Sequence, residues 1–362
     1  MPTSHTIQSS HFNGGGPSWP EKTLPIDFHA HWLPASISDL LRARSAAPMI
    51  ETRADGGENL VSMFRPIPVE DALDTIDERL VTMDRYGITH GVLSLTPVMG
   101  VESLDIEDAL PIARAVNDAA AEACVAHPDR FSALATLPVA DIEAAAEEFD
   151  RALRLPGIVG GLLPSDGFLS IQRAEKFRPI LDVAERHRAV VMVHYGNIAD
   201  DPERPRPDLS DTKDLRIGTL DMQARLSSNM ITFCMTDFLD DYPNVTVMSH
   251  NLGGNIPFEV ERLDHRTLVD HADRPLPSKT IRAARVMVDC NSLGASSIER
   301  AVEVYGAHRI VLGTDGTEFG MKWSIDAIAK TNLTDTDKAA ILHGNAAAVL
   351  EPLIGGARVA AE

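Results

Sequence analysis

The sequence predicts an α/β fold, namely a closed (β/α)8 TIM barrel with cap insertions after its first and fifth strands. Short apolar or β-branched runs alternate with longer segments of helical period, which is the pattern of repeated βα units around a parallel sheet. Eight such pairs follow one another, the number that a closed barrel requires. A length of 362 residues fits one barrel with insertions, because α/β barrels routinely form single domains of about 250 residues.

The strand candidates are short apolar runs bounded by polar or turn-forming residues. In chain order they cover 24–29, 88–95, 131–137, 158–163, 189–194, 245–250, 284–290 and 310–314. A helix candidate follows each of them, over 69–86, 108–126, 142–155, 171–188, 219–241, 256–271, 298–305 and 335–350. An open doubly wound sheet usually has fewer strands and a G-x-G-x-x-G turn after the first one. Because no such turn follows 24–29, a closed barrel is the better prediction.

The predicted domain is a single barrel over 23–354. A flexible arm rich in Ser, Gly and Pro (1–22) precedes it, and a short tail (355–362) follows it. Two connections are unusually long, 31–68 after the first strand and 195–217 after the fifth. Both follow carboxyl ends of strands, where a barrel carries its active site, so we predict that they form caps. The second is proline-rich and charged, which fits a lid and an oligomer contact equally well.

The balance of charge excludes some classes of partner. Asp and Glu number 53 against 33 Lys and Arg, and the formal net charge of −20 argues against binding to nucleic acid or to an anionic membrane. The three cysteines are scattered without C-x-x-C spacing, so neither a disulfide framework nor a thiolate zinc site is expected. With no signal peptide and no apolar run of membrane-spanning length, we expect a soluble cytoplasmic protein.

The first predicted strand ends in a pair of histidines within the segment Ile-Asp-Phe-His-Ala-His. Residues two apart on a strand face the same side, so His29 and His31 can both point into the barrel mouth and offer imidazoles to one cation. Asp27 shares that face, and we expect it to hydrogen-bond one of the imidazoles and orient its ring.

Three other predicted strands end in comparable donors. The fifth ends at His194, the sixth at His250 and the eighth at Asp315. Donors at four strand ends on one face of a barrel point to a shared metal ion. Three imidazoles and a carboxylate, from His29, His31, His194 and Asp315, fit one divalent ion with an open position; zinc is favoured, and Mn2+ or Fe2+ would also be accepted. His250 can be a fifth ligand, but a proton-carrying role suits it better.

At this point the sequence resembles a known family, the metal-dependent amidohydrolase superfamily, in the branch typified by aminocarboxymuconate-semialdehyde decarboxylase. The resemblance runs from about residue 25 to 353, and its most specific segments are IDFHAHWLP, MVH, YPNVTVMSHNLGG and VLGTD. It implies a (β/α)8 barrel with one divalent metal held by His29, His31, His194 and Asp315. It also implies that His250 is catalytic, and we expect Asp315 to share the handling of a proton.

Two positions depart from the pattern of that family. The family commonly has His-Leu-Gly-Gly after the sixth strand, whereas Asn251 follows His250 here. The eighth strand usually continues as Asp-Tyr-Pro, whereas this chain reads Asp315-Gly316-Thr317-Glu318. Both changes lie at the predicted mouth, where they bear on the substrate and on the reaction. Glu318 together with His250 could hold a second metal.

Other residues have candidate roles at the mouth. Relatives are expected to use a cap arginine to bind a substrate carboxylate through its two-pronged donor geometry. Of the arginines in the first cap, Arg65 has the apolar neighbours of a pocket wall, and Trp32 either lines the pocket or packs in the core. Gly253 and Gly254 are expected to allow close backbone approach after the sixth strand, and His90 is expected to be structural.

The leading functional hypothesis is non-oxidative decarboxylation of a small unsaturated or aromatic carboxylic acid, that is, C–C lyase activity. Hydrolysis or hydration by a metal-bound water, with His250 as base, is the first alternative. A two-metal, oxygen-activating hydroxylase, or a partner subunit of such a complex, is a further one, and a chiefly structural role is the last. We expect a homo-oligomer, a dimer or tetramer, with a hetero-oligomer as the alternative.

Overall fold

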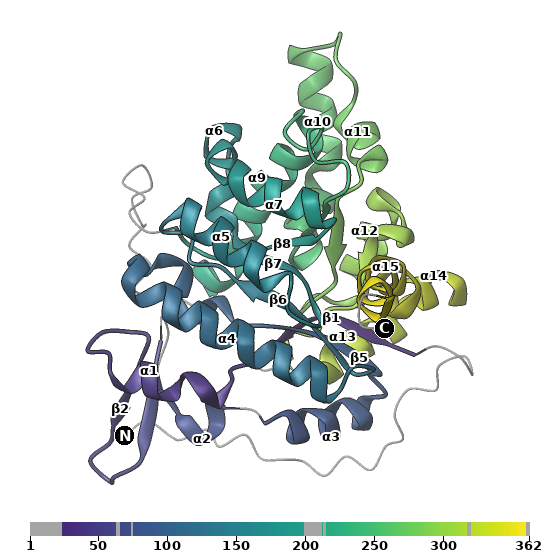
Figure 1. Cartoon of the computed structure of the whole chain (residues 1–362). Helices are drawn as coiled ribbons and strands as arrows, with labels where there is room; N and C mark the ends of the chain where they lie inside the picture. Colours follow the sequence, from purple (N-terminus) through teal and green to yellow (C-terminus); the bar gives the residue numbers. More distant parts are fainter. Residues whose placement is uncertain are drawn as a thin grey trace.

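The computed structural model describes residues 24–62, 66–73, 75–198, 212, 215–316 and 320–359. At its centre lies one sheet of eight parallel strands in the order β1-β5-β6-β7-β8-β9-β10-β11 (Figure 1). The end of the sheet returns to its start, because the backbone N–H of Phe28 donates to the carbonyl of Leu312 (2.9 Å) and that of Asp315 donates to the carbonyl of His29 (2.8 Å). The sheet is therefore closed into the predicted (β/α)8 barrel.

All eight predicted strands are confirmed, several of them shorter than expected. They are β1 (Ile26–His31), β5 (His90–Ser94), β6 (Phe131–Thr136), β7 (Ile158–Pro164), β8 (Val190–His194), β9 (Thr246–Ser249), β10 (Met287–Asp289) and β11 (Ile310–Val311). Nearly all their side chains are buried, since helices cover the outside of the barrel and side chains fill the inside.

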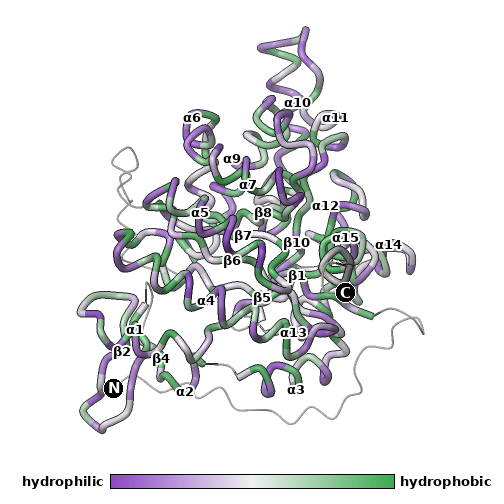
Figure 2. The backbone as a smooth tube through the Cα atoms, viewed as in Figure 1, coloured by the Kyte–Doolittle hydropathy of each residue, from purple (hydrophilic) through white to green (hydrophobic). Residues whose placement is uncertain are grey.

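The side chains inside the barrel come from alternate positions on the strands. Val190 and Met192 of β8, Met248 of β9 and Val311 of β11 belong to one buried cluster. Their neighbours Val191, Val193 and Val247 belong instead to the larger core between the strands and the surrounding helices. In Figure 2, hydrophobic residues are frequent along the strands at the centre of the molecule. In β8 and β9 the alternation sets which residues at the strand ends face the barrel interior, whereas the pairing register of β1 shifts between Asp27 and Ala30.

Helices surround the barrel as predicted, with some differences in their ends. The longer ones are α3 (Ile76–Tyr86), α4 (Ile106–Ala126), α5 (Ile142–Ala152), α7 (Arg178–His187), α9 (Met222–Met235), α10 (Ile256–Asp270), α12 (Ala295–Tyr305) and α15 (Asn345–Val359). The shorter ones are α1 (Ser38–Arg42), α2 (Val69–Ala72), α6 (Ile171–Ala174), α11 (Pro277–Ala283), α13 (Met321–Ala329) and α14 (Asp335–Ala339). Two helices, α11 and α13, were not predicted, and the helix predicted over 219–241 is shorter than expected, since α9 ends at Met235.

The first cap insertion is a small folded unit. Its antiparallel sheet contains β2 (Met49–Thr52), β3 (Glu58–Val61) and β4 (Ile67–Pro68), and it lies beside α1 at the purple end of the chain in Figure 1. A separate apolar cluster that includes Leu41 and Leu60 holds it against α4. The insertion after the first strand is thus confirmed. Of the second insertion, the structure describes 195–198, 212 and a π-helical segment, η6 (Arg216–Asp221), that leads into α9.

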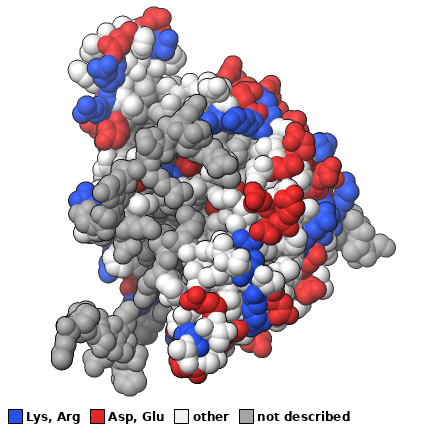
Figure 3. All heavy atoms as spheres, turned by 90° about the vertical axis from the view of Figure 1, so that its left-hand side faces the viewer, with Lys and Arg blue, Asp and Glu red and all other residues white. Residues whose placement is uncertain are grey.

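The predicted domain boundaries stay predictions. The arm 1–22 lies outside the described residues, and α15 extends to Val359, into the segment 355–362 that we expect to be a tail. Among the described helices, none has the length and apolar character needed to cross a lipid bilayer. On the described part of the face in Figure 3, basic and acidic side chains are interspersed and form no continuous basic surface.

Candidate metal centre

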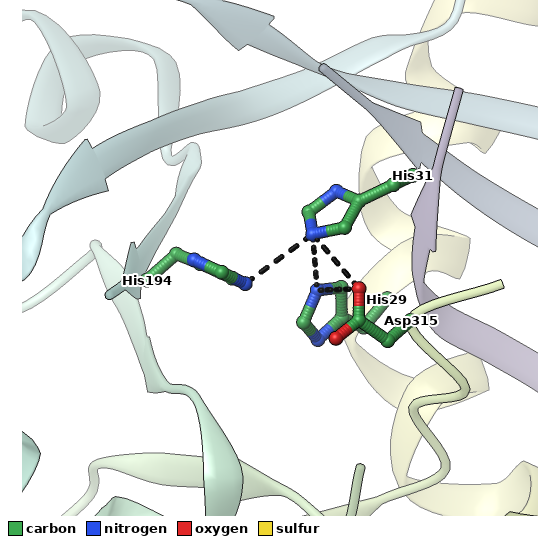
Figure 4. Close-up of side chains that lie close together, drawn as sticks. All are labelled: His29, His31, His194 and Asp315. Carbon is green, nitrogen blue, oxygen red and sulfur yellow. Dashed lines mark hydrogen bonds and ion pairs between the residues drawn. The ribbon is translucent and has the colours of Figure 1, made fainter. Parts of the chain in front are cut away.

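Four side chains from three strand ends converge at the carboxyl end of the barrel (Figure 4). Nε2 of His31 lies 3.0 Å from Nε2 of His29, 3.3 Å from Nε2 of His194 and 3.1 Å from Oδ1 of Asp315. All four residues are buried. This is the set that the sequence predicts, and one ligand atom from each residue lies within 4.8 Å of those from the others.

Strand periodicity explains why these side chains meet. His194 lies two residues beyond Met192 and four beyond Val190, both of which point into the barrel. His250 lies two residues beyond Met248, whereas Asp315 follows the end of β11 at Val311 and is presented by a turn. In β8 and β9 the apolar part of the strand therefore faces the core, and the next inward position places a histidine at the mouth.

The hydrogen bonds of two of the imidazoles leave nitrogen lone pairs pointing at one place. Nδ1 of His194 lies 2.9 Å from the carbonyl oxygen of Tyr195, which can only accept, so Nδ1 carries the proton and Nε2 has the lone pair. Nδ1 of His29 lies 3.2 Å from a carboxylate oxygen of Asp289, with the same consequence. Because facing lone pairs and a carboxylate repel one another, this donor set fits a divalent cation.

The pKa values of the histidines in the cluster also favour a bound cation. Burial lowers the pKa of His29, but the neighbouring Asp289 more than offsets this and raises it to about 9. Burial, together with the positive charges of neighbouring histidines, holds the pKa of His31 and His194 well below the usual range. Those two imidazoles are therefore neutral at neutral pH, the form that binds a metal. The raised pKa of His29 reflects the carboxylates around it, and their negative charge favours a cation at this place.

Several contacts hold the ligand residues in position. Nδ1 of His31 lies 3.1 Å from Oγ of Ser94, and Nδ2 of Asn291 donates to Oδ2 of Asp315 (3.1 Å), which leaves Oδ1 facing the imidazoles. Asp315 has a left-handed backbone (φ 59°), and its turn packs beside the buried Arg79, which donates to the carbonyl of His31. The aspartate is thus presented by a turn that the surrounding structure stabilises.

Asp27 does not form the predicted hydrogen bond with an imidazole ring. It accepts from the backbone N–H of His29 (3.1 Å) and from Thr314, so it anchors the backbone of the strand end rather than an imidazole ring. Its burial raises the pKa of its carboxyl group to about 6. The expectation that Asp27 orients a histidine ring is therefore wrong; a different aspartate does so.

That aspartate is Asp289, which the sequence analysis missed. Its Oδ2 lies 3.2 Å from Nδ1 of His29 and 3.4 Å from Nδ1 of His250, and its Oδ1 accepts from the backbone N–H groups of Asn251 and Asn291. Burial opposes ionisation, but the two histidines hold the pKa of Asp289 well below its usual range. The signal was present, since Asp289 follows the apolar run of the seventh strand as the other donors follow theirs.

Of the four remaining predicted site residues, the structure describes two. His250 is buried beside the cluster, with its ring stacked on that of His194 at 4.0 Å between centroids. Trp32 is buried in the main core, and its backbone N–H donates to the carbonyl of Ser94 (2.8 Å). Arg65 and Glu318 lie outside the described residues, so the predicted carboxylate-binding arginine and the second-metal ligand are not placed.

Two further expectations concern the cap arginines and His90. Arg42, Arg44 and Arg53 each form an ion pair with an acidic side chain, so their charge is already neutralised. His90 begins β5, where its ring nitrogens lie 2.9 Å from Oγ of Ser132 and 3.2 Å from the carbonyl oxygen of Asp129. Its structural role is confirmed.

A buried acid near the mouth gives a prediction about pH. Oε1 of Glu102 is buried and has no hydrogen-bond partner in the part of the chain that the structure describes, and it lies against Gly196, two residues beyond His194. Burial raises the pKa of Glu102 from 4.5 to about 8. The native state then binds this proton more tightly than the unfolded chain, so stability from this group is full below pH 4.5 and is lost as pH rises to about 8.

We therefore expect Glu102→Gln to remove part of the alkaline loss of stability. Between pH 5 and 8, the free energy of unfolding of the variant should rise relative to the unsubstituted protein by about 1 kcal/mol per pH unit. Urea unfolding at several pH values measures this, with the exposed Glu107→Gln as the matched control. Parallel pH profiles for the unsubstituted protein and Glu102→Gln would contradict the assignment.

Known proteins resemble the chain over most of its length. The chain is 27% identical over 290 residues to a gamma-resorcylate decarboxylase from Rhizobium sp. strain MTP-10005, covering 76% of this chain and 86% of that protein. It is 24% identical over 344 residues to the 2-amino-3-carboxymuconate-6-semialdehyde decarboxylase of Dictyostelium discoideum, covering 90% and 91%.

A solved structure shares the fold. It is the 5-carboxyvanillate decarboxylase from Novosphingobium aromaticivorans, solved with manganese and 4-hydroxy-3-methoxy-5-nitrobenzoic acid; the TM-score is 0.69 at 20% identity, over 94% of this chain and 100% of that one. In addition, a family model described as amidohydrolase matches residues 26–351. Because this match covers most of the sequence, the chain belongs to the amidohydrolase family, as its motifs indicate.

Proposed function

We propose that the protein is a metal-dependent decarboxylase that removes CO2 from a small aromatic or unsaturated carboxylic acid without oxidation. The observation that carries the proposal is the convergence of His29, His31, His194 and Asp315 at the barrel mouth, with His250 beside them. The decarboxylases that resemble the chain over three-quarters or more of its length support this choice of reaction. Their names give gamma-resorcylate and 2-amino-3-carboxymuconate-6-semialdehyde as the compounds that they decarboxylate, which supports the proposed substrate class.

In the proposed reaction, the bond between the substrate carbon and its carboxylate breaks, CO2 leaves, and the carbon takes up a proton. A divalent ion held by the four ligands would supply positive charge that stabilises negative charge on the carboxylate or on a neighbouring hydroxyl. His250 and Asp315 are the proposed proton-handling residues, because both are buried at the mouth. We further propose that Trp32 lines the substrate pocket and that Arg65 binds the carboxylate.

We propose zinc as the resident ion, because three imidazoles and one carboxylate with an open position suit it. Manganese is the alternative, since this donor set does not discriminate strongly between the two and a structure with the same fold contains manganese. Elemental analysis of the purified protein distinguishes them. About one ion per chain is the expected content, whereas two irons, or iron with manganese, would favour the oxygen-activating alternative.

The test is an assay for released CO2. Protein loaded with Zn2+ or Mn2+ is supplied with a panel of hydroxybenzoates and muconate-type acids, and the products are identified by mass. We expect at least one acid to lose CO2 at a rate that falls when the metal is removed by a chelator. Hydrolysis or hydration products without CO2, or no turnover across the whole panel, would contradict the proposal.

We also propose a cytoplasmic homo-oligomer, either a dimer or a tetramer. Two features support assembly: a cap after the first strand with its own small core and an exposed Leu215 and Leu220 beside the second insertion. Light scattering of the purified protein measures the mass directly. A monomer at micromolar concentration would contradict this part of the proposal.

A further inference from the structure

His250 makes a contact at each of its two ring nitrogens, and the two contacts differ in kind. Nδ1 forms no hydrogen bond with the described residues, but it lies 3.4 Å from Oδ2 of Asp289, a carboxylate oxygen whose negative charge favours a proton on the nitrogen that faces it. Nε2 lies 3.0 Å from the amide nitrogen Nδ2 of Asn251, which can only donate. In a neutral imidazole one nitrogen carries the proton and the other a lone pair. The surroundings of His250 therefore place the proton on Nδ1 and the lone pair on Nε2.

The orientation of the Asn251 amide depends on Gln223 of α9. Nε2 of Gln223 donates to Oδ1 of Asn251 at 3.0 Å, so the oxygen of Asn251 faces α9 and its nitrogen faces His250. If this amide were reversed, its oxygen would face Nε2 and would require a proton there. Gln223 donates to Asn251 only in the orientation that also lets Asn251 donate to His250, while Oε1 of Gln223 has no partner among the described residues. All three side chains are buried, where a mismatched donor and acceptor are costly.

The loop after β9 is built to bring Asn251 to this position. Asn251 and Leu252 both have left-handed backbones (φ 56° and 55°), a conformation that Asn tolerates better than most residues. A Cβ on Gly254 would lie 2.3 Å from the carbonyl oxygen of Gln223, so only glycine allows the loop to pack this closely on α9. This confirms the close approach predicted for the glycine pair, and it is what brings Asn251 within reach of Gln223.

We infer that Gln223 and Asn251 are positioning residues that fix the proton of His250 on Nδ1 and so present Nε2 as a proton acceptor. The inference deepens the proposed function and rests on it for the catalytic role of His250. It assigns His250 the task of a base, which takes a proton from a substrate hydroxyl that displaces the N–H of Asn251. As CO2 leaves, the carbon takes up one proton, and the proton held by His250 supplies it, either directly or through Asp315, so that the step balances.

The discriminating variant is Gln223→Glu, which does not touch His250. A carboxylate at 223 cannot donate to Oδ1 of Asn251, so the amide should reverse and present its oxygen to Nε2. Nitrogen NMR on protein labelled with 15N-histidine distinguishes the two neutral forms, and the signal of His250 is assigned by its loss in His250→Gln. We expect the Nδ1–H form in the unsubstituted protein and the Nε2–H form in Gln223→Glu, with the exposed Gln172→Glu unchanged as the control.

A second variant covers the case in which Gln223→Glu does not fold. Asn251→Asp keeps the size and the tolerance of a left-handed backbone, but its carboxylate accepts from Nε2 instead of donating to it. It too should move the proton of His250 to Nε2. An Nδ1–H signal that persists in the folded variant, or in both folded variants, would overturn the inference.

Turnover gives an independent readout once a substrate is known. We expect each variant to lower kcat about 10- to 100-fold while KM changes much less, since the substrate contacts stay in place. Unchanged kcat would overturn the inference. The NMR experiment needs no substrate, so it decides the placement of the proton even if the CO2 assay fails and the proposed reaction is wrong.

Discussion

Replacing His194 by Ala is expected to remove the bound metal and to lower kcat/KM about 1000-fold. His194 contributes one of the three imidazole nitrogens, and its Nε2 lies 3.3 Å from that of His31. A metal ion contributes several kcal/mol to the stabilisation of negative charge in a transition state, and each 1.36 kcal/mol corresponds to a factor of ten in rate. Elemental analysis and CO2 release measure the two losses separately.

The control for this substitution is His265→Ala, which removes an exposed imidazole from α10. It should leave metal content and turnover unchanged. The same pair of variants tests whether the chain is chiefly a structural partner. If His194→Ala keeps both its oligomeric mass and the full activity of the assembly, the site on this chain is not the catalytic one, and the proposed function is wrong.

Replacing Asp289 by Asn should lower metal affinity about 10- to 100-fold, although Asp289 is not one of the four ligands. Asn keeps an oxygen that can accept from the backbone N–H groups of Asn251 and Asn291, so the local fold is preserved. Its amide nitrogen, however, would face Nδ1 of His29, and two donors cannot pair. His29 must then move its proton to Nε2, which removes the lone pair that binds the ion.

Titration of the apoprotein with Zn2+ or Mn2+ measures this change. The exposed Asp273→Asn is the matched control, since it makes the same chemical change away from the mouth. Equal affinities for the two variants would show that Asp289 does not orient His29. A simultaneous rise in the pKa of His29 is not expected, because removing the carboxylate removes the largest cause that raises it.

Much of the site could be predicted because strand geometry is regular. The two-residue period of a strand, counted from an apolar core position, correctly predicts that His194 and His250 face the mouth, whereas Asp315 is presented by a turn beyond the end of β11. The same count applied to the seventh strand would have found Asp289, two residues beyond the inward Met287. The position of Asp289 could therefore be predicted from the sequence alone.

Other features depend on tertiary contacts that no local period encodes. The pairing of Gln223 with Asn251 requires left-handed backbone after His250 and a glycine that fits against α9. The first cap was predicted as an insertion, but its three short strands carry few apolar residues and are held by a small separate core. α13 was missed because the helix over 335–350 already completed the count of eight pairs.

Anomalous diffraction from crystals grown with Mn2+ tests the central claim most directly. We expect one strong peak per chain, enclosed by Nε2 of His29, His31 and His194 and by a carboxylate oxygen of Asp315. The absence of a peak at this position, or a peak between His250 and Asp289 instead, would show that these four residues do not form the metal centre. Either result would contradict the proposed chemistry.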